Sequence, residues 1–512
     1  MTKTKLQGAP VLVVGAGIMG IGIAQVAAQS GHVVMLFDAR EGAARDAKHK
    51  LEAKLDDLVA KGKLNDDAAQ TILSRIEPIV ALEVASGVKL VVEAIVENLE
   101  FKRALFRQLE SLVGPQCVLA TNTSSISVTA IANGLAHPGR LVGMHFFNPV
   151  PLMKLVEVVS GLHTEPEVAE TIFDLARAWG KTAVRAKSTP GFIVNRIARP
   201  FYAETLALLQ EQAATPAVLD ACLKAAGFRM GACELMDLIG HDTNFAVTQS
   251  VYEANFHDKR YMPSLVQREM VEGGLLGRKS GRGFYRYHGE TVGMPPLVAI
   301  HDAPETAREV VVHGAGVIAD GLEQSAAAAL QAQGWGPARV HDSGWTGLAI
   351  DGARLVLTDG RTAQEMAAVL GSADVAVFDR PLVLPAPKGS ALAYALAPGA
   401  SEGWRAQAPA WLSALGFAPM PLADAPGLVV ARTIAMLINE AADAVLQGVC
   451  SEDGADAAMK LGVNYPAGPF EWLARWSARE VVAVLDALDH HHRGERYRAS
   501  PWLRRRITST PP

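Results

Sequence analysis

The second half of this 512-residue chain repeats the first half in a weakened form. The segment TPGFIVNRIARPFYAETLALL at residues 189–209 matches APGLVVARTIAMLINEAADAVL at residues 425–446. Upstream of these, VLVVGAGIMGIG at 11–22 is echoed by VVVHGAGVIADG at 310–321. Because both segments recur in the same order, the repeat indicates that an ancestral unit of two parts was duplicated.

The first 190 residues alternate short apolar runs with helical patterns, which predicts a doubly wound parallel sheet of the Rossmann type. The charged segment Asp46–Ala69 predicts a helical hairpin that projects from this sheet. From Pro190 to about Tyr287 the pattern is helical throughout. The expected strands are Val11–Val14, Val33–Phe37, Leu90–Val92, Val118–Thr121 and Leu141–Met144, and the expected helices are Ile18–Ser30, Arg45–Lys61 and Leu99–Val113.

The predicted fold class is therefore an α/β Rossmann domain, an all-α domain, a shortened and degenerate Rossmann-like domain, and a second all-α domain. We expect these domains at residues 1–189, 190–295, 296–424 and 425–512. The irregular, Pro-rich stretch at 293–304 marks the junction of the two halves.

Composition excludes several classes of protein. The formal net charge is −5, from 48 basic and 53 acidic residues, which argues against a nucleic-acid binder. Four widely spaced cysteines exclude a disulfide framework and favour the cytoplasm. Glycines interrupt the apolar run Val11–Ala28, which argues against a signal peptide, and no other stretch is long and apolar enough to span a membrane.

A G-x-G-x-x-G turn between the first strand and the first helix predicts a dinucleotide site. Gly15 permits the tight turn, Gly17 lets a pyrophosphate approach the backbone, and Gly20 allows close helix–strand packing. Asp38 follows 18 residues after Gly20, where a carboxylate binds the adenosine ribose. This favours NAD over NADP, although Arg40 could accept the extra phosphate of NADP.

The corresponding turn in the second half, Gly314–Ala315–Gly316 with Ala319, lacks an acidic residue at the same distance. Asp342 lies too far along the chain. The pattern therefore favours a vestigial structural domain over a second NAD site.

Three segments place polar residues where core patterning predicts apolar ones. The sequence NTSS at Asn122–Ser125 follows a predicted strand, at the sheet edge where ligands bind in such folds. His145 and Glu157 interrupt an otherwise apolar run, GMHFFNPVPLMKLVEVV. Asn195 lies in the first turns of a helix in PGFIVNR.

These segments together resemble the 3-hydroxyacyl-CoA dehydrogenase family. GAGIMG, VVEAIVEN, NTSS, HFFNPVPLMKLVEVV, TPGFIVNR and GRKSGRGFY occur in that family's order and spacing. The resemblance covers residues 9–287 and, a second time, the helical repeat at 426–498. It implies NAD-dependent oxidation of an (S)-3-hydroxyacyl-CoA thioester. A two-copy chain of this length resembles the branch of the family that acts on 3-hydroxyadipyl-CoA in bacterial phenylacetate breakdown, a pathway related to β-oxidation. The other expected substrate is 3-hydroxybutyryl-CoA.

The resemblance also implies roles for individual residues. His145 is the expected base, because an imidazole titrates near operating pH, and Glu157 would orient its ring. Ser124 and Asn195 would hold the C3 oxygen and the thioester carbonyl. Lys54 and Lys61 match positions that meet CoA phosphates. The residues expected to bind the cofactor are Gly15, Gly17, Ile18, Met19, Gly20, Asp38, Glu97, Lys102 and Asn122.

The chain departs from the family pattern in two places. Ala431 stands where the first copy has Asn195, and no counterpart of NTSS or of the His–Glu pair is visible between Gly314 and Pro426, so the second half is expected to be inactive. Arg229 replaces a proline of the first helical domain and is a candidate partner for a distal substrate carboxylate.

The resemblance implies a helical domain of the kind that builds the dimer interface in single-copy relatives. The two helical domains are therefore expected to pair within this chain, with a homo-oligomer also possible. No metal site is expected, because His490–His492 has no carboxylate or cysteine pattern beside it. Two alternative functions stay open: a dehydrogenase of a free hydroxy acid, and a non-catalytic NAD-binding structural or sensing protein.

Overall fold

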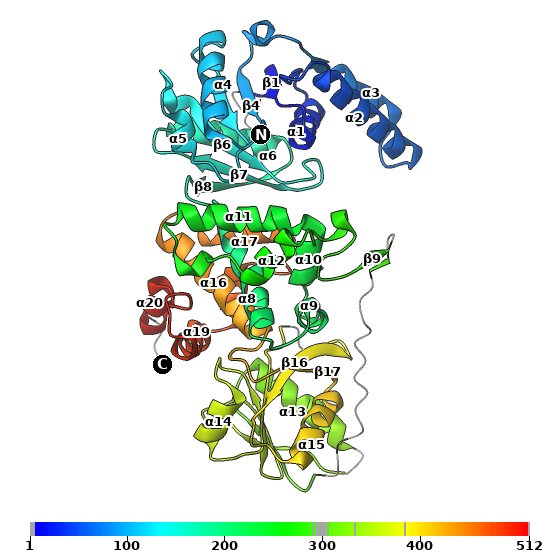
Figure 1. Cartoon of the computed structure of the whole chain (residues 1–512), viewed down its shortest axis with the longest axis vertical. Coiled ribbons are helices and arrows are strands. Elements are labelled where there is room, and N and C mark those ends of the chain that lie inside the picture. The colour runs from blue at the N-terminus through cyan, green and yellow to red at the C-terminus, as the bar shows by residue number, and fades with distance from the viewer. Residues whose placement is uncertain are drawn as a thin grey trace. The chain divides into compact units, whose positions relative to one another are not determined.

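The computed structural model describes residues 6–288, 291–292, 304, 307–331, 334–382 and 386–509. It divides into two compact units, one made of Met1–Arg196 with Ala444–Asn464 and the other of Ile197–Asp443 with Tyr465–Pro512. Each unit contains one large sheet (Figure 1). The predicted junction at 293–304 lies almost wholly outside the described residues.

The sheet of the first unit has eight strands in the order β3-β2-β1-β4-β5-β6-β7-β8, which confirms the predicted Rossmann domain. The projecting hairpin is also present, as α2 and α3 (Figure 1). The strands are β1 Val11–Val14, β2 Val34–Phe37, β3 Ile76–Pro78, β4 Leu90–Glu93, β5 Val118–Thr121, β6 Leu141–Phe146, β7 Leu155–Ser160 and β8 Thr182–Lys187. The helices are α1 Ile18–Gln29, α2 Ala43–Ala60, α3 Asp66–Ser74, α4 Leu99–Leu112, α5 Val128–Ala132, α6 Pro166–Ala178 and α7 Val194–Ile197.

The five predicted strands run parallel to one another, and an antiparallel pair is formed by β7, which was not predicted. β7 runs antiparallel to β6, and His145 lies directly opposite Glu157 in the register. Only residues 147–154 connect these two strands. A connection of that length is too short for the crossover that a parallel pair requires.

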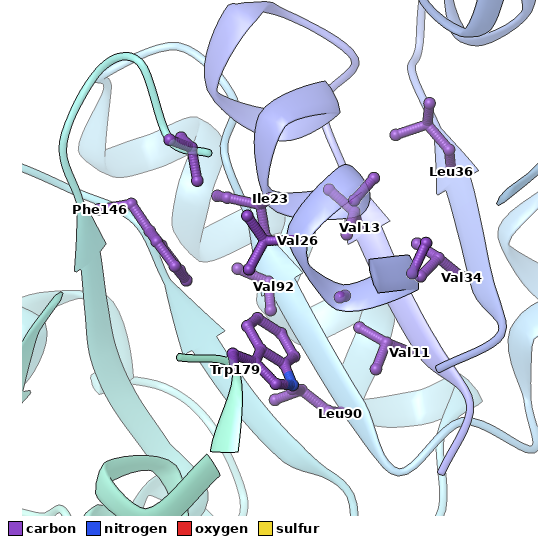
Figure 2. Close-up of a cluster of buried hydrophobic side chains, with 14 of the residues drawn as sticks. Val11, Val13, Ile23, Val26, Val34, Leu36, Leu90, Val92, Phe146 and Trp179 are labelled. Carbon is purple, nitrogen blue, oxygen red and sulfur yellow. The ribbon is translucent and has the colours of Figure 1, made fainter. Parts of the chain in front are cut away.

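The core of this sheet is apolar on both faces, as in other parallel sheets covered by helices. Val11, Val13, Leu90 and Val92 are at most 1% exposed and pack with α1 (Figure 2). Trp179, which ends α6, packs into the same cluster (Figure 2). This packing anchors the carboxyl edge of the sheet, where the polar segments lie.

The second unit contains a seven-stranded sheet in the order β12-β11-β13-β14-β15-β16-β17. It follows the first sheet from β2 to β8, except that β13 runs antiparallel to its neighbours where β4 is parallel. A turn at Asp351–Gly352, with both φ angles positive, joins β13 to β14 and shortens the domain. The strands are β11 Val310–His313, β12 Ala338–Val340, β13 Gly347–Ile350, β14 Ala353–Leu357, β15 Val375–Phe378, β16 Ser390–Leu396 and β17 Phe417–Pro421, with helices α13 Val317–Leu330, α14 Ala363–Leu370 and α15 Glu402–Ala414.

Two sets of helices complete the chain, one after each Rossmann-like part (Figure 1). Their presence confirms the helical texture predicted after Pro190 and its repeat. The first set is α8 Arg199–Gln210, α9 Pro216–Ala225, α10 Ala232–Ile239, α11 His241–Ala254 and α12 Leu265–Glu272. The second set is α16 Val430–Leu446, α17 Glu452–Gly462, α18 Pro469–Arg475, α19 Ala478–His492 and α20 Pro501–Ser509.

The two helical sets bind each other through reciprocal contacts in the second unit. Glu204 of the first set bonds to Arg496 at 2.8 Å and to the Tyr497 hydroxyl at 3.0 Å in the second set. Its repeat partner Glu440 bonds in turn to Arg260 and to the Tyr261 hydroxyl, at 3.3 and 2.6 Å. An Arg–Tyr pair of each copy thus holds a buried glutamate of the other, as in an interface with two-fold symmetry.

Each sheet is also covered by a helix from the other copy. In the first unit, α17 of the second set packs against β7 and β8. In the second unit, α9 of the first set packs against β16. The predicted pairing of the two helical domains within one chain is confirmed.

The buried pair of His32 and Trp179 makes the stability of the first unit depend on pH. The Trp179 indole N–H donates to His32 Nε2 at 2.9 Å, so Nδ1 carries the ring hydrogen and donates to the Ala9 carbonyl at 2.8 Å. Burial lowers the pKa of His32 below its ordinary 6.5. The unfolded chain therefore takes up the proton first, and stability falls as the pH drops below 6.5.

We expect the thermal midpoint of the first unit to fall between pH 7 and pH 5, because the free energy of unfolding drops by up to ~1.4 kcal/mol per pH unit. His32→Gln should be less stable at pH 7 and should flatten this dependence, because the titrating ring is gone. Thermal unfolding followed by circular dichroism at pH 5, 6 and 7 tests this. His49→Gln, at an exposed position, is the control. An unchanged slope in His32→Gln would contradict the assignment.

Candidate active site

The glycine turn between β1 and α1 has a backbone that other residues could not adopt. Gly15 has a φ of +101°, and a Cβ there would lie 2.5 Å from the Ala94 carbonyl oxygen. A Cβ on Gly20 would lie 1.7 Å from the Gly15 carbonyl oxygen. At Gly17 a Cβ would meet nothing within 4 Å, and the next residue, Ile18, is 72% exposed. The turn therefore leaves an open cradle that fits a pyrophosphate at the start of α1.

Asp38, at the end of β2, fixes this cradle. Its carboxylate accepts hydrogen bonds from the Ala16 N–H at 2.8 Å and from the Arg40 N–H and side chain at 2.9–3.1 Å. Burial alone would favour the neutral acid, but these hydrogen bonds hold the pKa of Asp38 below its ordinary value. Arg40 is thus paired with the carboxylate that a ribose would contact.

A cavity of about 610 Å³ opens beside the turn within the first unit. It is lined by the turn, by α2 and by the loop Asn148–Pro151. Lys54 lines it together with Lys50, which the sequence analysis did not single out. Lys61 does not line this cavity and pairs with Asp57 at 2.6 Å on the hairpin surface.

The NTSS loop is held by Glu97. One carboxylate oxygen accepts from the Thr123 hydroxyl at 2.6 Å and from the N–H groups of Ser124 and Ser125 at 2.8 and 3.1 Å. Burial opposes ionisation of Glu97, but Lys102 and these donors hold its pKa below the ordinary value. Lys102 lies 3.2 Å from Glu97 and is only 1% exposed. Lys102 therefore acts in the structure as a buried counter-ion that positions the loop.

Three further hydrogen bonds connect the groups around this loop to the neighbouring strands. Glu93, which ends β4 and is fully buried, binds Lys102 at 2.6 Å and accepts from the Thr121 hydroxyl at 2.7 Å. Asn122 accepts from the Phe146 N–H at 2.8 Å, which ties the loop to the strand that carries His145. Sequence reasoning missed Glu93, although a charged residue ending an apolar strand is a usable signal.

His145 and Glu157 form a buried pair across β6 and β7. His145 Nδ1 lies 2.5 Å from Glu157 Oε2, and their side chains are 6% and 0% exposed. Since a carboxylate only accepts, Nδ1 carries a hydrogen, which in the neutral ring leaves the lone pair on Nε2. The ring also packs against Phe147 and Phe192, with centroids 4.5 and 5.8 Å away. The imidazole is therefore fixed in the tautomer of a base.

The second oxygen of Glu157 holds the start of α7. It accepts from the N–H groups of Ile193 and Val194, at 3.1 and 2.9 Å. Asn195 follows directly, and its side-chain amide donates to the Ser124 carbonyl at 3.4 Å. The structure thus brings together the four residues predicted from separate segments.

The second copy contributes to the scaffold of this site within the first unit. Arg196, next to Asn195, donates to Gln447 at 2.8 Å. Gly462, at the end of α17, packs so closely that a Cβ there would lie 2.7 Å from Leu155 and 3.0 Å from Val194. These two residues flank Glu157 in the sheet and at the start of α7, so α17 backs the pair of His145 and Glu157. No short-range pattern in the sequence points to this contact.

The second sheet differs at the equivalent positions. Its register, counted back from the Pro–Gly before α16, puts Asp379 where His145 stands and Ala393 where Glu157 stands. Fully buried Asp379 accepts from the N–H groups at the start of α16, Val429 at 2.9 Å and Val430 at 2.7 Å. The carboxylate that holds the helix is kept, while the histidine is lost.

Arg229 is exposed between α9 and α10 in the second unit, so its predicted contact with substrate stays a prediction. Across the described residues, no group of three His, Cys, Asp or Glu side chains could hold a metal ion. In the same part of the chain, no helix is long and apolar enough to cross a bilayer.

Comparison with known proteins matches the chain to three family models. These are the NAD-binding domain of 3-hydroxyacyl-CoA dehydrogenase at residues 10–189, its C-terminal domain at 191–287 and 427–510, and the reduced Rossmann-fold domain of 3-hydroxybutyryl-CoA dehydrogenase at 355–426. The chain belongs to the 3-hydroxyacyl-CoA dehydrogenase family. It is accordingly an NAD-dependent oxidoreductase that acts on a CH–OH group.

Individual relatives agree with this assignment. The 3-hydroxyadipyl-CoA dehydrogenase of Escherichia coli K12 is 43% identical over 97% of each chain. A probable 3-hydroxybutyryl-CoA dehydrogenase of Deinococcus radiodurans is 45% identical over 54% of this chain and 99% of its own length. Among solved structures, 3-hydroxybutyryl-CoA dehydrogenase of E. coli K12 has a TM-score of 0.86 at 42% identity, covering 98% of both chains.

Glu157→Gln should lower kcat by about 10²–10⁴-fold. The amide can offer its N–H to Nδ1, which favours the wrong tautomer, and it no longer stabilises an imidazolium. The measurement is NADH formation from 3-hydroxybutyryl-CoA. Fluorescence titration with NADH should show unchanged cofactor affinity. A kcat within threefold of the wild type would refute the role of the pair.

Gly462→Val should lower kcat by about 10–100-fold while leaving NADH affinity unchanged, because the added methyl groups displace β7 and the start of α7. Ala457→Val, half-buried on the same helix, is the matched control for the cost of a β-branched residue. The same steady-state assay compares both variants. Equal kcat values for the two would show that the catalytic pair does not depend on this packing.

Proposed function

We propose that this chain oxidises (S)-3-hydroxyacyl-CoA to 3-oxoacyl-CoA, with His145 as the base. The observation that carries the proposal is the buried pair of His145 Nδ1 and Glu157 Oε2 at 2.5 Å. With Nδ1 committed to Glu157, Nε2 is the nitrogen that takes the hydroxyl proton from the substrate. Glu157 then stabilises the imidazolium across the same hydrogen bond.

The other residues of the site bind and orient the substrate. Ser124 and Asn195 hold the C3 oxygen and the thioester carbonyl, which aligns the C3–H bond for reaction. Ser124 is well suited because Glu97 fixes its backbone N–H at 2.8 Å. Phe147 and Phe192, packed on the His145 ring, keep water from the base.

The cofactor is NAD, held by the glycine turn and by Asp38. When bound, NAD supplies the acceptor for the two electrons and the hydrogen that leave C3. Asp38 discriminates against a 2′-phosphate by charge, and Arg40 does not offset this because Asp38 already pairs with it. In this proposal Glu97 and Asn122 contact the nicotinamide side of the cofactor, and buried Lys102 supports them through its ion pair with Glu97.

We propose 3-hydroxyadipyl-CoA as the preferred substrate and phenylacetate catabolism as the pathway. The E. coli relative of that name matches this chain end to end, although a structure named for 3-hydroxybutyryl-CoA does so as well. Arg229 would bind the distal carboxylate of the adipyl chain, and Lys54 the phosphates of CoA. Four free cysteines, three of them buried, fit the reducing cytoplasm.

The substrate proposal predicts faster NADH formation from 3-hydroxyadipyl-CoA than from 3-hydroxybutyryl-CoA at equal concentration. Arg229→Met should reduce that preference about tenfold, the equivalent of one charge-assisted hydrogen bond. Arg268→Met, which removes another exposed arginine of the same unit, should leave it unchanged. A preference unaltered by Arg229→Met would remove this residue from the substrate site.

The same assay separates the alternatives. Turnover of free 3-hydroxyadipate at a rate similar to the thioester would favour a dehydrogenase of free hydroxy acids. Tight NADH binding without turnover of any substrate would favour a non-catalytic NAD-binding protein.

A further inference from the structure

A small pocket in the second unit is lined by three arginines and, within the part of the chain that the structure describes, by no acidic residue. Arg199 begins α8, Arg260 lies between α11 and α12, and Arg496 follows α19 in the second copy. The pocket has a volume of about 50 Å³, which is room for about three to five water molecules. This arginine pocket therefore has the size and the sign of charge that suit a small anion.

Arg199 is only 6% exposed, and burial disfavours its charged form, which lowers the pKa of its guanidinium. The side chain donates to the Thr248 hydroxyl at 3.2 Å and lies over the Tyr202 ring at 4.9 Å. Counted from the Pro–Gly before each helix, Ala435 stands at the same place in α16 of the second copy. Because the repeat forms its helix with an alanine there, the buried arginine serves something other than the helix itself.

Tyr202, three residues further along α8, supplies a hydrogen-bond donor that the protein does not use. Its side chain lines the arginine pocket and is 5% exposed, and its hydroxyl makes no hydrogen bond with the residues that the structure describes. Burial raises the pKa of this hydroxyl, which therefore keeps its proton. Ile438 stands at the same place in α16. Since a buried hydroxyl without a partner is costly, this one indicates an acceptor that enters the pocket.

The other two arginines of the pocket also keep N–H groups that the protein leaves unused. Arg260 pairs with Glu440 and Asp443, but its Nε is buried without a hydrogen-bond partner among the described residues. Arg496 donates to Glu204 from Nε at 3.2 Å and from Nη2 at 2.8 Å, which leaves Nη1. The three carboxylates do not line the pocket. The pocket thus gathers positive charge and donors around a space without a negative charge of its own.

We infer that the arginine pocket binds one small tetrahedral oxyanion, of the phosphate or sulfate class, at a site separate from the dehydrogenase site. The three arginines neutralise its charge, and the Tyr202 hydroxyl donates to one of its oxygens. Arg260 and Arg496 also hold the buried glutamates of the contact between the two helical sets. The bound anion therefore stabilises the pairing of the two copies within the second unit.

Isothermal titration calorimetry of the full chain with inorganic phosphate tests the inference. Saturating NADH fills the dinucleotide site, and the buffer contains no chloride, which would compete for the arginines. The expected result is one phosphate bound per chain. AMP carries its phosphate on a body for which the pocket has no room, so it should bind at least ~10-fold more weakly. Absence of phosphate binding would overturn the inference, and AMP binding as tight as that of phosphate would overturn the assignment to the free ion.

Tyr202→Phe locates the ion, because it removes one oxygen atom that bonds to no described residue. It should weaken phosphate binding about tenfold, the equivalent of one hydrogen bond to a charged group. Tyr252→Phe is the matched control, since Tyr252 is half-buried on α11 of the same unit and does not line the pocket. It should bind phosphate like the wild type. Equal phosphate binding by the two variants would exclude this pocket.

Arg199→Ala introduces the residue that the repeat has at this place and should weaken phosphate binding about 100-fold. Phosphate should raise the thermal midpoint of the wild-type chain but not that of Arg199→Ala, because a ligand stabilises only a chain that binds it. Dehydrogenase activity should be unchanged in all three variants, which verifies folding. Phosphate binding and thermal stabilisation of Arg199→Ala equal to those of the wild type would contradict the inference.

Discussion

The buried carboxylate of Glu157 is the interaction on which the rest of the site depends. One oxygen fixes the tautomer of His145, and the other accepts two N–H groups at the start of α7. A fully buried carboxylate is costly unless all its lone pairs are used, so the strand, the imidazole and the helix that carries Asn195 must come together. The same contacts that stabilise the fold thereby bring His145 and Asn195 into one place.

The duplicated half keeps the structural part of this arrangement and loses the chemical part. Asp379 still accepts the N–H groups at the start of α16, but it stands at the position of the histidine, and Ala393 replaces the glutamate. The second copy contributes packing contacts to the first. Its helix α17 supports the strands that carry Glu157, and its Arg496 and Tyr497 hold Glu204 of the first copy. Packing contacts are therefore kept in the second copy, while the histidine–glutamate pair is not.

Much of the site could be predicted from the sequence because its chemistry is local. The turn at Gly15 and Gly20 has steric requirements that only glycine meets, and His145 and Glu157 are conspicuous in an apolar run. A role for Glu93 was not predicted, because a charged residue at the end of a strand is also common on protein surfaces. The support from Gln447 and Gly462 could not be predicted, because it joins segments more than 250 residues apart.

The sequence by itself determined the Rossmann turn, the order of domains, the duplication and the residue types of the chemistry, because each depends on short-range pattern and sterics. Tertiary structure alone decided the register of β6 and β7 that sets His145 opposite Glu157, and the exchange of α9 and α17 between the two copies. These features depend on which apolar faces meet and which buried polar groups find partners. That choice is made by the whole chain at once, and no local segment encodes it.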